Sequence, residues 1–479
     1  MKRKSGILMH ITMLWGDYSI GGFGRSAEQF IDFLSDCGFS YWQVLPFGVT
    51  DECNSPYKSY SAFAGNPYFV DLEQLCDKGL VTAEELDSLR QNTPYVCEYD
   101  FLEDTRLPIL RKASQRVSEA HRADIESFIK NKKRLSDFCV FMALKESNGG
   151  KECCDFTTDT YDAGTLFMWK FIQYEFFSQW KKVREYANKK GIAIIGDIPI
   201  YVSPDSADVF ADKALFDMDS RGRPKSVAGV PPDYFCEDGQ LWGNPLYNWK
   251  KMREDGYAWW CERMRHNLDM FDGVRIDHFR GFESFWSVPA DASSAREGKW
   301  VKSGGKRFIG EIRKVVGDSL VIAEDLGDIT PEVEELVRYS GFPGMKVFQF
   351  GFLGDNNSPH LPHNYTDNCV AYTGTHDNNT LLGYIWELDE NTRKRVFDYC
   401  GYNGNDWDEA CRHIVKTILA SHAATVIIPI QDILGYGRDT RMNIPGEADG
   451  NWRIRFTYEQ INSIDRARLR HLNNLYGRA

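Results

Sequence analysis

The segment Gly273-Val274-Arg275-Ile276-Asp277 is a short apolar run that closes on an acid, and the same pattern recurs along the chain. The run is too brief for a helix and is typical of a buried strand. Side chains of a strand alternate in direction. Arg275 and Asp277 are therefore expected on one side of a sheet, with the two aliphatic side chains on the other.

Seven further apolar runs end where Gly, Pro, Asp or Asn follows, as strands commonly do. Together with the first, they lie at 7–11, 41–45, 192–198, 273–277, 320–324, 345–350, 369–372 and 425–430. Amphipathic helical patterns separate several of them, for example at 27–37 and 331–339. The second helix follows Thr330, a suitable N-cap, and has Pro331 at its first position.

Strands that alternate with helices pair in parallel through right-handed crossovers, and eight such units predict an α/β fold, the TIM (β/α)8 barrel. An open doubly wound sheet is the alternative, but no Gly-x-Gly-x-x-Gly motif follows any of the runs. We expect a single catalytic barrel over 1–479 with inserted, mainly helical subdomains. Residues 71–170 would form a helical insertion between strands 2 and 3. Residues 202–270 would lie between strands 3 and 4 and contribute to the active-site cleft.

The composition narrows the possible partners. The 479 residues carry 69 acidic and 57 basic side chains, a net charge of -12, and no long basic run, which argues against nucleic acid and anionic membranes as partners. The 12 cysteines have no zinc spacing, so we expect reduced thiols in a cytoplasmic protein. No stretch approaches the ~18 apolar residues of a membrane helix. His10 and Thr12 interrupt the apolar start, which favours a first strand over a signal peptide.

Acids at or just past the strand ends are the candidate reactive groups, because active sites of such barrels lie at the carboxyl ends of the strands. They are Asp197, Asp277, Glu324 and Asp377. A lone acid at a strand end is more often a helix cap or turn residue. Four acids at corresponding positions favour a common site instead.

Neighbouring residues suggest different protonation states for two of these acids. The guanidinium of Arg275 would favour the ionised form of Asp277, as a nucleophile requires, although a purely structural ion pair is the alternative. Burial and the adjacent Asp325 would raise the pKa of Glu324, so that it could act as a general acid. Paired carboxyl groups of this kind cleave glycosidic bonds, with retention when they lie ~5–5.5 Å apart and inversion when wider.

The pair His376-Asp377 follows the strand at 369–372. It could bind a metal, but no further ligand stands at helical spacing, so we expect no metal. Hydrogen bonds to sugar hydroxyls and stabilisation of an oxocarbenium-like transition state are the better use of this pair.

At these residues the chain resembles the amylomaltases, or 4-α-glucanotransferases, of glycoside hydrolase family 77, which are relatives of the α-amylases. Besides the three acidic segments, the resemblance rests on Ser55-Pro56-Tyr57, SAFAGNP at 61–67, GDIP at 196–199, AGVPPDYF at 228–235, GQLWGNP at 239–245, RMNIPG at 441–446 and GNW at 450–452. It extends over essentially the whole chain. The segment 18–24 departs from the family pattern, which affects local substrate contacts rather than the chemistry.

The resemblance implies residue roles in an α-retaining mechanism. Asp277 would be the nucleophile, Glu324 the acid/base and Asp377 the transition-state stabiliser. Residues matching positions that line the donor sugar sites are Asp197, Arg275, His278, His376 and Asn443. Residues matching positions that hold glucose units along the cleft are Ser55, Tyr57, Gln240 and Trp242.

The expected activity is transfer of a segment of a 1,4-α-D-glucan to a new 4-position in glucose or another 1,4-α-glucan, with no cofactor. Maltooligosaccharides would be the partners, and the protein could be a monomer or a homodimer. The loop 226–235, with Tyr234 and Phe235, would cover the cleft. Two other functions share the same acids or the same fold: an α-glucan hydrolase and a non-catalytic glucan-binding protein.

Overall fold

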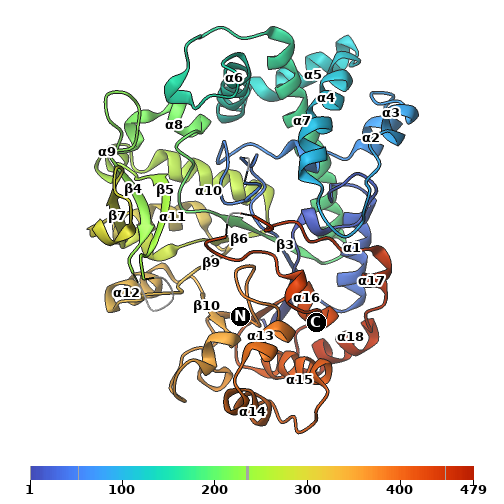
Figure 1. Cartoon of the computed structure of the whole chain (residues 1–479), viewed down its shortest axis with the longest axis vertical. Coiled ribbons are helices and arrows are strands. Elements are labelled where there is room, and N and C mark those ends of the chain that lie inside the picture. Colours follow the sequence, from blue (N-terminus) through green and yellow to red (C-terminus); the bar gives the residue numbers. More distant parts are fainter. Residues whose placement is uncertain (1, 52, 233–236, 448) are drawn as a thin grey trace.

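The computed structural model describes residues 2–51, 53–232, 237–447 and 449–479, and its centre is a closed barrel of eight parallel strands (Figure 1). The strands are β1 (Lys4–Leu8), β2 (Tyr41–Gln43), β3 (Ala193–Ile198), β6 (Gly273–Ile276), β9 (Leu320–Ala323), β10 (Gly344–Val347), β11 (Cys369–Tyr372) and β12 (Thr425–Pro429). They neighbour one another in this order, and β12 pairs with β1. Each overlaps a predicted run, so the predicted fold class is confirmed.

The strand register aligns the acids at one end of the barrel. Asp197 of β3 lies opposite Arg275 of β6, and Ile276 lies opposite Ala323 of β9. The ladder continues one residue further, because Asp277 N donates to the Ile198 carbonyl and Glu324 N to the Ile276 carbonyl, both at 3.0 Å. The acids therefore stand side by side where their strands end.

Barrel helices follow the predicted amphipathic patterns. The apolar side chains of α1 (Arg25–Asp36) are buried, including Phe30, Phe33 and Leu34. Helix α12 (Pro331–Ser340) has Thr330 at its N-cap position and ends at Gly341 in the left-handed region. The Thr330 side chain makes no capping hydrogen bond, so Pro331 and the acids of the first turn start this helix instead.

Between β2 and β3 the chain forms a layer of helices, seen at the top and right of Figure 1. They are α2 (Leu72–Asp77), α3 (Ala83–Asp87), α4 (Tyr99–Gln115), α5 (Glu119–Lys130) and α6 (Lys133–Ser147). The long α7 (Ala163–Lys189) packs against α4, α5 and α6 and also against α1. Helix α7 thus joins this layer to the barrel.

A small antiparallel sheet beside the barrel was not predicted. It contains β4 (Ser226–Val230), β5 (Gln240–Pro245), β7 (Ser284–Pro289) and β8 (Lys299–Lys302), in the order β5-β4-β7-β8. Its strands come from two separate barrel connections, between β3 and β6 and between β6 and β9. The same region holds α8 (Ala207–Ala211), α9 (Trp249–Glu254) and α10 (Ala258–Met270). A left-handed Gly256-Tyr257 pair separates the last two.

The remaining helices complete the barrel wall. They are α11 (Gly305–Val316), α13 (Leu381–Glu387), α14 (Glu390–Tyr399), α15 (Trp407–Ala420), α16 (Ile430–Leu434), α17 (Tyr458–Asn462) and α18 (Arg466–Leu475). Helix α18 packs on α1 and α15, next to the seam between β1 and β12. In the described part of the chain, no helix has both the length and the apolar character needed to cross a bilayer.

Candidate active site

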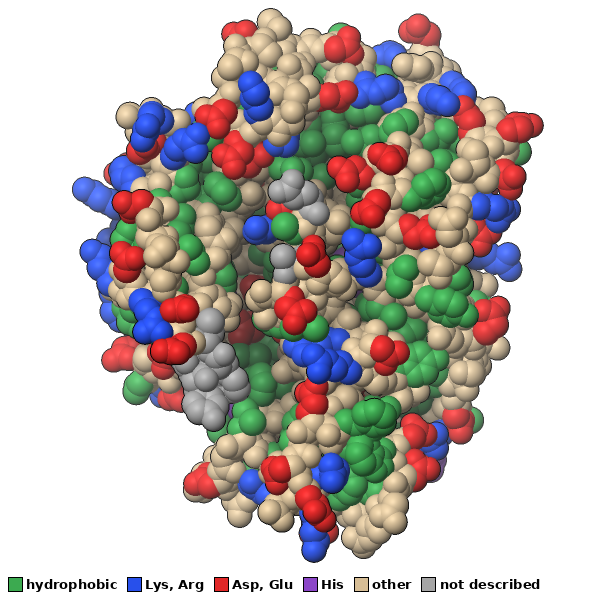
Figure 2. Space-filling view, in the orientation of Figure 1, with side chains coloured by type: hydrophobic (Ala, Val, Ile, Leu, Met, Phe, Trp, Pro, Cys, Tyr) green, Lys and Arg blue, Asp and Glu red, His purple; other side chains and the backbone are tan. Residues whose placement is uncertain are grey.

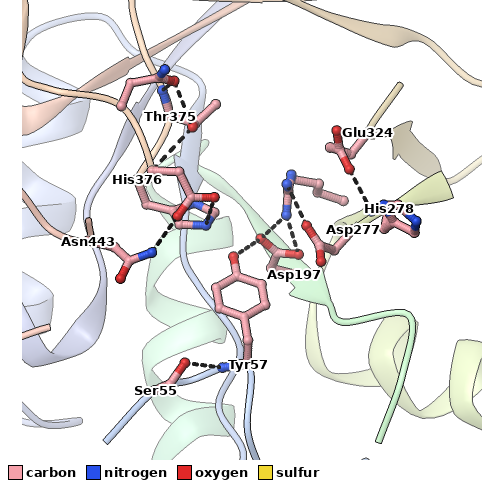
Figure 3. A network of polar contacts seen from close by, with 12 residues as sticks. Ser55, Tyr57, Asp197, Asp277, His278, Glu324, Thr375, His376 and Asn443 are labelled. Carbon is pink, nitrogen blue, oxygen red and sulfur yellow. Dashed lines mark hydrogen bonds and ion pairs between the residues drawn. The ribbon is translucent and has the colours of Figure 1, made fainter. Parts of the chain in front are cut away.

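Arg275 connects two of the predicted acids (Figure 3). Its Nη1 lies 2.9 and 2.7 Å from the two carboxylate oxygens of Asp197, and its Nη2 donates to Asp277 Oδ1 at 2.8 Å. The Asp197 side chain is fully buried and that of Arg275 nearly so. The guanidinium therefore fixes the Asp277 carboxylate from below and leaves its other oxygen free of this contact.

Tyr57 joins this ion-pair network to the opposite wall of the site. Its hydroxyl donates to Asp197 Oδ2 at 2.8 Å, and its ring stacks on His376 with the centroids 5.0 Å apart. The Tyr57 backbone N–H donates to Ser55 Oγ at 3.3 Å, which shapes the loop before the ring. One aromatic side chain thus contacts Asp197 of β3 and His376, which follows β11.

Glu324 accepts two backbone hydrogen bonds. His278 N donates to Oε2 at 2.6 Å, and Leu326 N donates to Oε1 at 2.9 Å. Burial and the negative charge of Asp277 nevertheless raise the pKa of Glu324 to about 7. The raised pKa agrees with the sequence prediction. The negative charge that raises it belongs to Asp277, however, and not to Asp325 as predicted. Asp325 turns outward to accept a hydrogen bond from Met345 N at 2.6 Å, because neighbouring residues of an extended chain point in opposite directions.

Asp377 lies on the loop that follows β11 and is held in its ionised form. Asn443 Nδ2 donates to its Oδ1 at 2.6 Å, and His376 Nε2 lies 3.3 Å from its Oδ2. Burial alone would raise the pKa of Asp377, but the charge and hydrogen bond of His376, with the Asn443 bond, lower it to about 2. Arg441 also donates to the Asp377 carbonyl at 2.5 Å.

A cleft of about 570 Å³ opens over these groups, and Figure 2 shows the molecule hollowed near the centre of this face, with acidic atoms at the floor. The predicted site residues that line it are Ser55, Tyr57, Gln240, Trp242, Asp277, His376, Asp377 and Asn443. Asp197 and Arg275 are buried beneath Asp277, while His278 and Glu324 are half-buried beside it. All twelve predicted residues therefore lie in or next to one cleft.

The small sheet reaches this cleft through β5. Trp242 Nε1 donates to Gln240 Oε1 at 3.0 Å, and the Trp242 ring meets the His278 ring edge to face, with the centroids 4.9 Å apart. His278 adopts a left-handed backbone conformation with φ 51°, which turns the chain sharply after Asp277. Burial lowers the pKa of His278 to about 4, so its ring is neutral.

The cleft contains further residues that the sequence prediction left out. They include Tyr201, Asn244, Glu447, Asn451 and Trp452. The Trp452 ring lies 5.9 Å from that of Tyr57 and 5.8 Å from that of His376. Its place in the GNW motif was the available signal. Of the predicted cover loop, residues 233–235 lie outside the described residues, so its role stays a prediction.

The side chains with metal-ligand spacing lie outside the cleft. In the described segments, one group of side chains has metal-ligand spacing, Glu152, Cys154 and Asp155, and it does not line the cleft. Asp155 is also paired with Arg223 at 2.9 Å. The cleft instead opens over carboxyl groups at the ends of adjacent strands. One of them, Glu324, has a pKa near neutrality. This is typical of barrel enzymes that act on glycosidic bonds.

Comparison with known proteins identifies the family. The family model described as 4-alpha-glucanotransferase matches residues 9–461, and the chain belongs to this family. The 4-alpha-glucanotransferase of Synechocystis sp. is 42% identical over 100% of this chain and 98% of its own length. That of Thermus thermophilus is 40% identical over 98% of both chains.

Solved structures agree in fold. The amylomaltase from Streptococcus agalactiae, in complex with acarbose, superposes with a TM-score of 0.97 at 37% identity, covering 100% of both chains. The amylomaltase from Corynebacterium glutamicum has a TM-score of 0.79 at 18% identity, over 99% of this chain and 75% of that one. The second likeness concerns the fold alone.

Proposed function

We propose that this chain is a 4-α-glucanotransferase, which moves a segment of a 1,4-α-D-glucan to the 4-position of glucose or of another glucan by a retaining double displacement. Its family membership supports the reaction. The observation that carries the mechanism is the pairing of Asp277, held by Arg275, with Glu324, whose pKa is raised to about 7. One group is set to attack and the other to donate a proton.

The strand register supports retention of configuration. Asp277 and Glu324 follow directly after Ile276 and Ala323, which lie opposite each other in neighbouring strands. Neighbouring strands lie ~4.8 Å apart. Carboxyl groups of retaining enzymes lie ~5–5.5 Å apart, whereas inverting enzymes need a wider gap for a water molecule. The register therefore favours direct attack by Asp277.

In the first step, an oxygen of Asp277 forms a bond to the anomeric carbon as the glycosidic bond breaks, and Glu324 gives its proton to the departing oxygen. Positive charge develops on the sugar ring. The ionised Asp377 stabilises this charge and accepts hydrogen bonds from ring hydroxyls, while His376 and Asn443 hold its carboxylate in place. A glycosyl ester on Asp277 results.

In the second step, Glu324, now ionised, removes the proton from a 4-hydroxyl of the acceptor, whose oxygen displaces Asp277 from the anomeric carbon. Transfer exceeds hydrolysis when the acceptor is held against the intermediate in place of water. The aromatic and amide side chains of Tyr57, Trp242 and Gln240 line the cleft and can supply such acceptor contacts.

Incubation with maltotriose tests this proposal. A transferase gives glucose and a ladder of longer maltooligosaccharides at constant reducing ends, whereas steady growth of reducing ends would indicate an α-glucan hydrolase. Asp277→Asn is expected to abolish both transfer and hydrolysis. The control is Asp328→Asn, an exposed acid past β9, which should retain activity. If Asp277→Asn keeps wild-type activity, the assigned nucleophile is wrong, and a protein with no activity in any form would only bind glucans.

Two further predictions accompany the function. None of the cysteines that the structure describes forms a disulfide bond, which is compatible with the predicted cytoplasmic location. Maltooligosaccharides and other 1,4-α-glucans are the proposed partners. Sedimentation equilibrium would distinguish the monomer from the homodimer.

A further inference from the structure

Two tryptophan rings form an exposed aromatic pair outside the catalytic cleft. Trp386 of α13 is 66% exposed, the highest value for a large hydrophobic side chain among the described residues. Trp407, the first residue of α15, is half-buried, and its ring meets that of Trp386 at 84° with the centroids 5.5 Å apart. Single exposed apolar residues are ordinary, but two adjoining indoles form a broad apolar surface in contact with water.

Charged groups lie next to this pair. The guanidinium of Arg393 lies over the Trp407 ring, 5.2 Å from its centroid. Next to Trp386 in sequence, Glu387 pairs with Arg438 at 3.3 Å, and both are largely exposed. Indole faces bordered by hydrogen-bond donors and acceptors suit a ligand with apolar ring faces and many hydroxyls. A protein interface core would instead be depleted of charge.

The pair lies at the catalytic end of the barrel. Helix α15 leads into the start of β12, so its first residue, Trp407, lies at the opposite end, where the strands finish. Helix α13 begins directly after the loop that carries Asp377. In Figure 2, hydrophobic surface gathers near the lower edge, over the region where Figure 1 places α13 and α15. This is the face on which the hollow opens.

A short segment connects the aromatic pair to the cleft. Arg438 contacts Glu387, Arg441 donates to the Asp377 carbonyl, and Asn443 donates to the Asp377 carboxylate. The six residues 438–443 can span at most ~20 Å. A glucan chain that leaves the cleft along this segment would therefore come within reach of Trp386.

We propose that Trp386 and Trp407 form a second α-glucan-binding surface, which holds the part of a long donor or acceptor chain that extends beyond the cleft; this inference rests on the proposed function. Sugar rings would stack on the indoles, with Glu387, Arg438 and Arg393 bonding their hydroxyls. Maltotriose is short enough to be held by the cleft alone and does not need this surface.

Trp386→Ala tests the surface by comparing long and short substrates. We expect the KM for amylose to rise about 3–10-fold, the loss of one ring stack, with kcat and KM for maltotriose within twofold of the wild type. Trp386→Phe should restore most of the amylose KM. Leu353→Ala is the matched control, because Leu353 is 65% exposed and lies outside the cleft. An unchanged amylose KM, or equal losses with both substrates, would overturn the proposal.

A binding experiment without turnover separates this proposal from the assigned reaction. The Asp277→Asn variant is run on an amylose-containing gel with excess maltotriose, which fills the cleft. Any retention, the slowing of the protein by amylose, then measures glucan binding outside the cleft. Trp386→Ala should reduce this retention even if the protein proves not to be a transferase. Unchanged retention in an active transferase would refute the second surface alone. A protein whose dimer dissociates on Trp386→Ala, with no change in retention, would instead assign the pair to a subunit interface.

Discussion

At the residue scale, the site depends on the different surroundings of three carboxyl groups that are chemically alike. Asp277 contacts the guanidinium of Arg275, and Asp377 contacts the imidazole of His376 and the amide of Asn443. Glu324 is instead buried next to the negative charge of Asp277. The pKa of Asp377 falls to about 2 and that of Glu324 rises to about 7. Environment, rather than residue type, therefore separates the proposed acid from the charge-stabilising group.

The raised pKa of Glu324 predicts the alkaline limb of the pH profile. The first step needs the protonated acid, which is lost as pH rises through about 7, so kcat/KM for maltotriose should fall above this pH. Glu324→Gln cannot transfer a proton at any pH, and it should slow transfer ~10²–10⁴-fold and remove this limb. Rates measured from pH 5 to 9 check both effects.

Glucan binding is the control for this substitution, because glutamine has nearly the same shape as glutamate and its one acceptor oxygen keeps one of the two hydrogen bonds from His278 N and Leu326 N. Affinity for maltooligosaccharides should stay close to that of the wild type. A variant with normal turnover and weak binding would contradict the acid role.

At the element scale, one buried carboxylate holds both ends of the loop that carries His376 and Asp377. Asp432, on α16, accepts a hydrogen bond from Thr373 Oγ1 at 2.5 Å and another from Leu381 N at 2.7 Å. Thr373 follows β11, and Leu381 begins α13. The position of the Asp377 loop is thus fixed by the element that follows β12.

Asp432→Asn should disturb this loop without removing any group from the cleft. An amide has one acceptor oxygen, so it cannot serve both donors as the carboxylate does. We expect kcat for maltotriose to fall about 10–100-fold, because small misplacements of reacting groups have effects of this size. Folding should persist, as judged by an unchanged near-ultraviolet circular dichroism spectrum.

The pH profile distinguishes positioning from general destabilisation. Burial raises the pKa of Asp432 to about 6, so the wild type loses an acceptor as pH falls through this value, and kcat should fall with it. Asp432→Asn should lack this acid limb. Asp408→Asn, an exposed acid of α15, is the control. A variant that keeps the limb would show that another group causes it.

The burial of each strand explains which elements could be predicted from the sequence. Barrel strands are buried on both faces, so they stand out as apolar runs, and all eight were located from them. The sheet β5-β4-β7-β8 was missed because its outer strands β5 and β8 are mostly exposed or half-buried, while serine and glycine interrupt the apolar residues of the more buried β4 and β7. Its pairing also joins connections that are distant in the chain.

Contacts in the site could be predicted where they follow from the alternating side-chain directions of one strand or from closeness in the sequence. Alternation placed Arg275 beside Asp277, only two residues away. The second partner of Arg275, Asp197, is 78 residues away, and its contact depends on strand register. Likewise, Asp432 is 59 residues from Thr373. Chain spacing carries no information about such contacts, which arise only when the barrel closes.

At the scale of the whole molecule, closure joins the two ends of the chain at the end of the barrel opposite the site. Strands β1 and β12 pair from Lys4 with Thr425 onward. The fully buried Arg478 donates to the carbonyls of Lys4, Leu419, Ser421 and Ala423 at 2.6–3.0 Å. Ser5 Oγ also donates to Asn473 at 2.6 Å. One guanidinium thereby satisfies carbonyls from both sides of the seam.

Arg478→Ala should therefore lower stability while leaving the chemistry intact. Each buried carbonyl left without a partner costs about 1–3 kcal/mol, so the free energy of unfolding should fall by about 3 kcal/mol or more. Conserving kcat for maltotriose at 25 °C is expected, because the strand ends that carry the acids lie at the other end of the barrel. Urea unfolding followed by fluorescence and circular dichroism measures the loss. Arg412→Ala, which removes two exposed ion pairs of α15, should change stability by less than about 1 kcal/mol. If Arg478→Ala matched this control, the seam would be held by strand pairing and packing alone, and the buried guanidinium would contribute nothing to barrel closure.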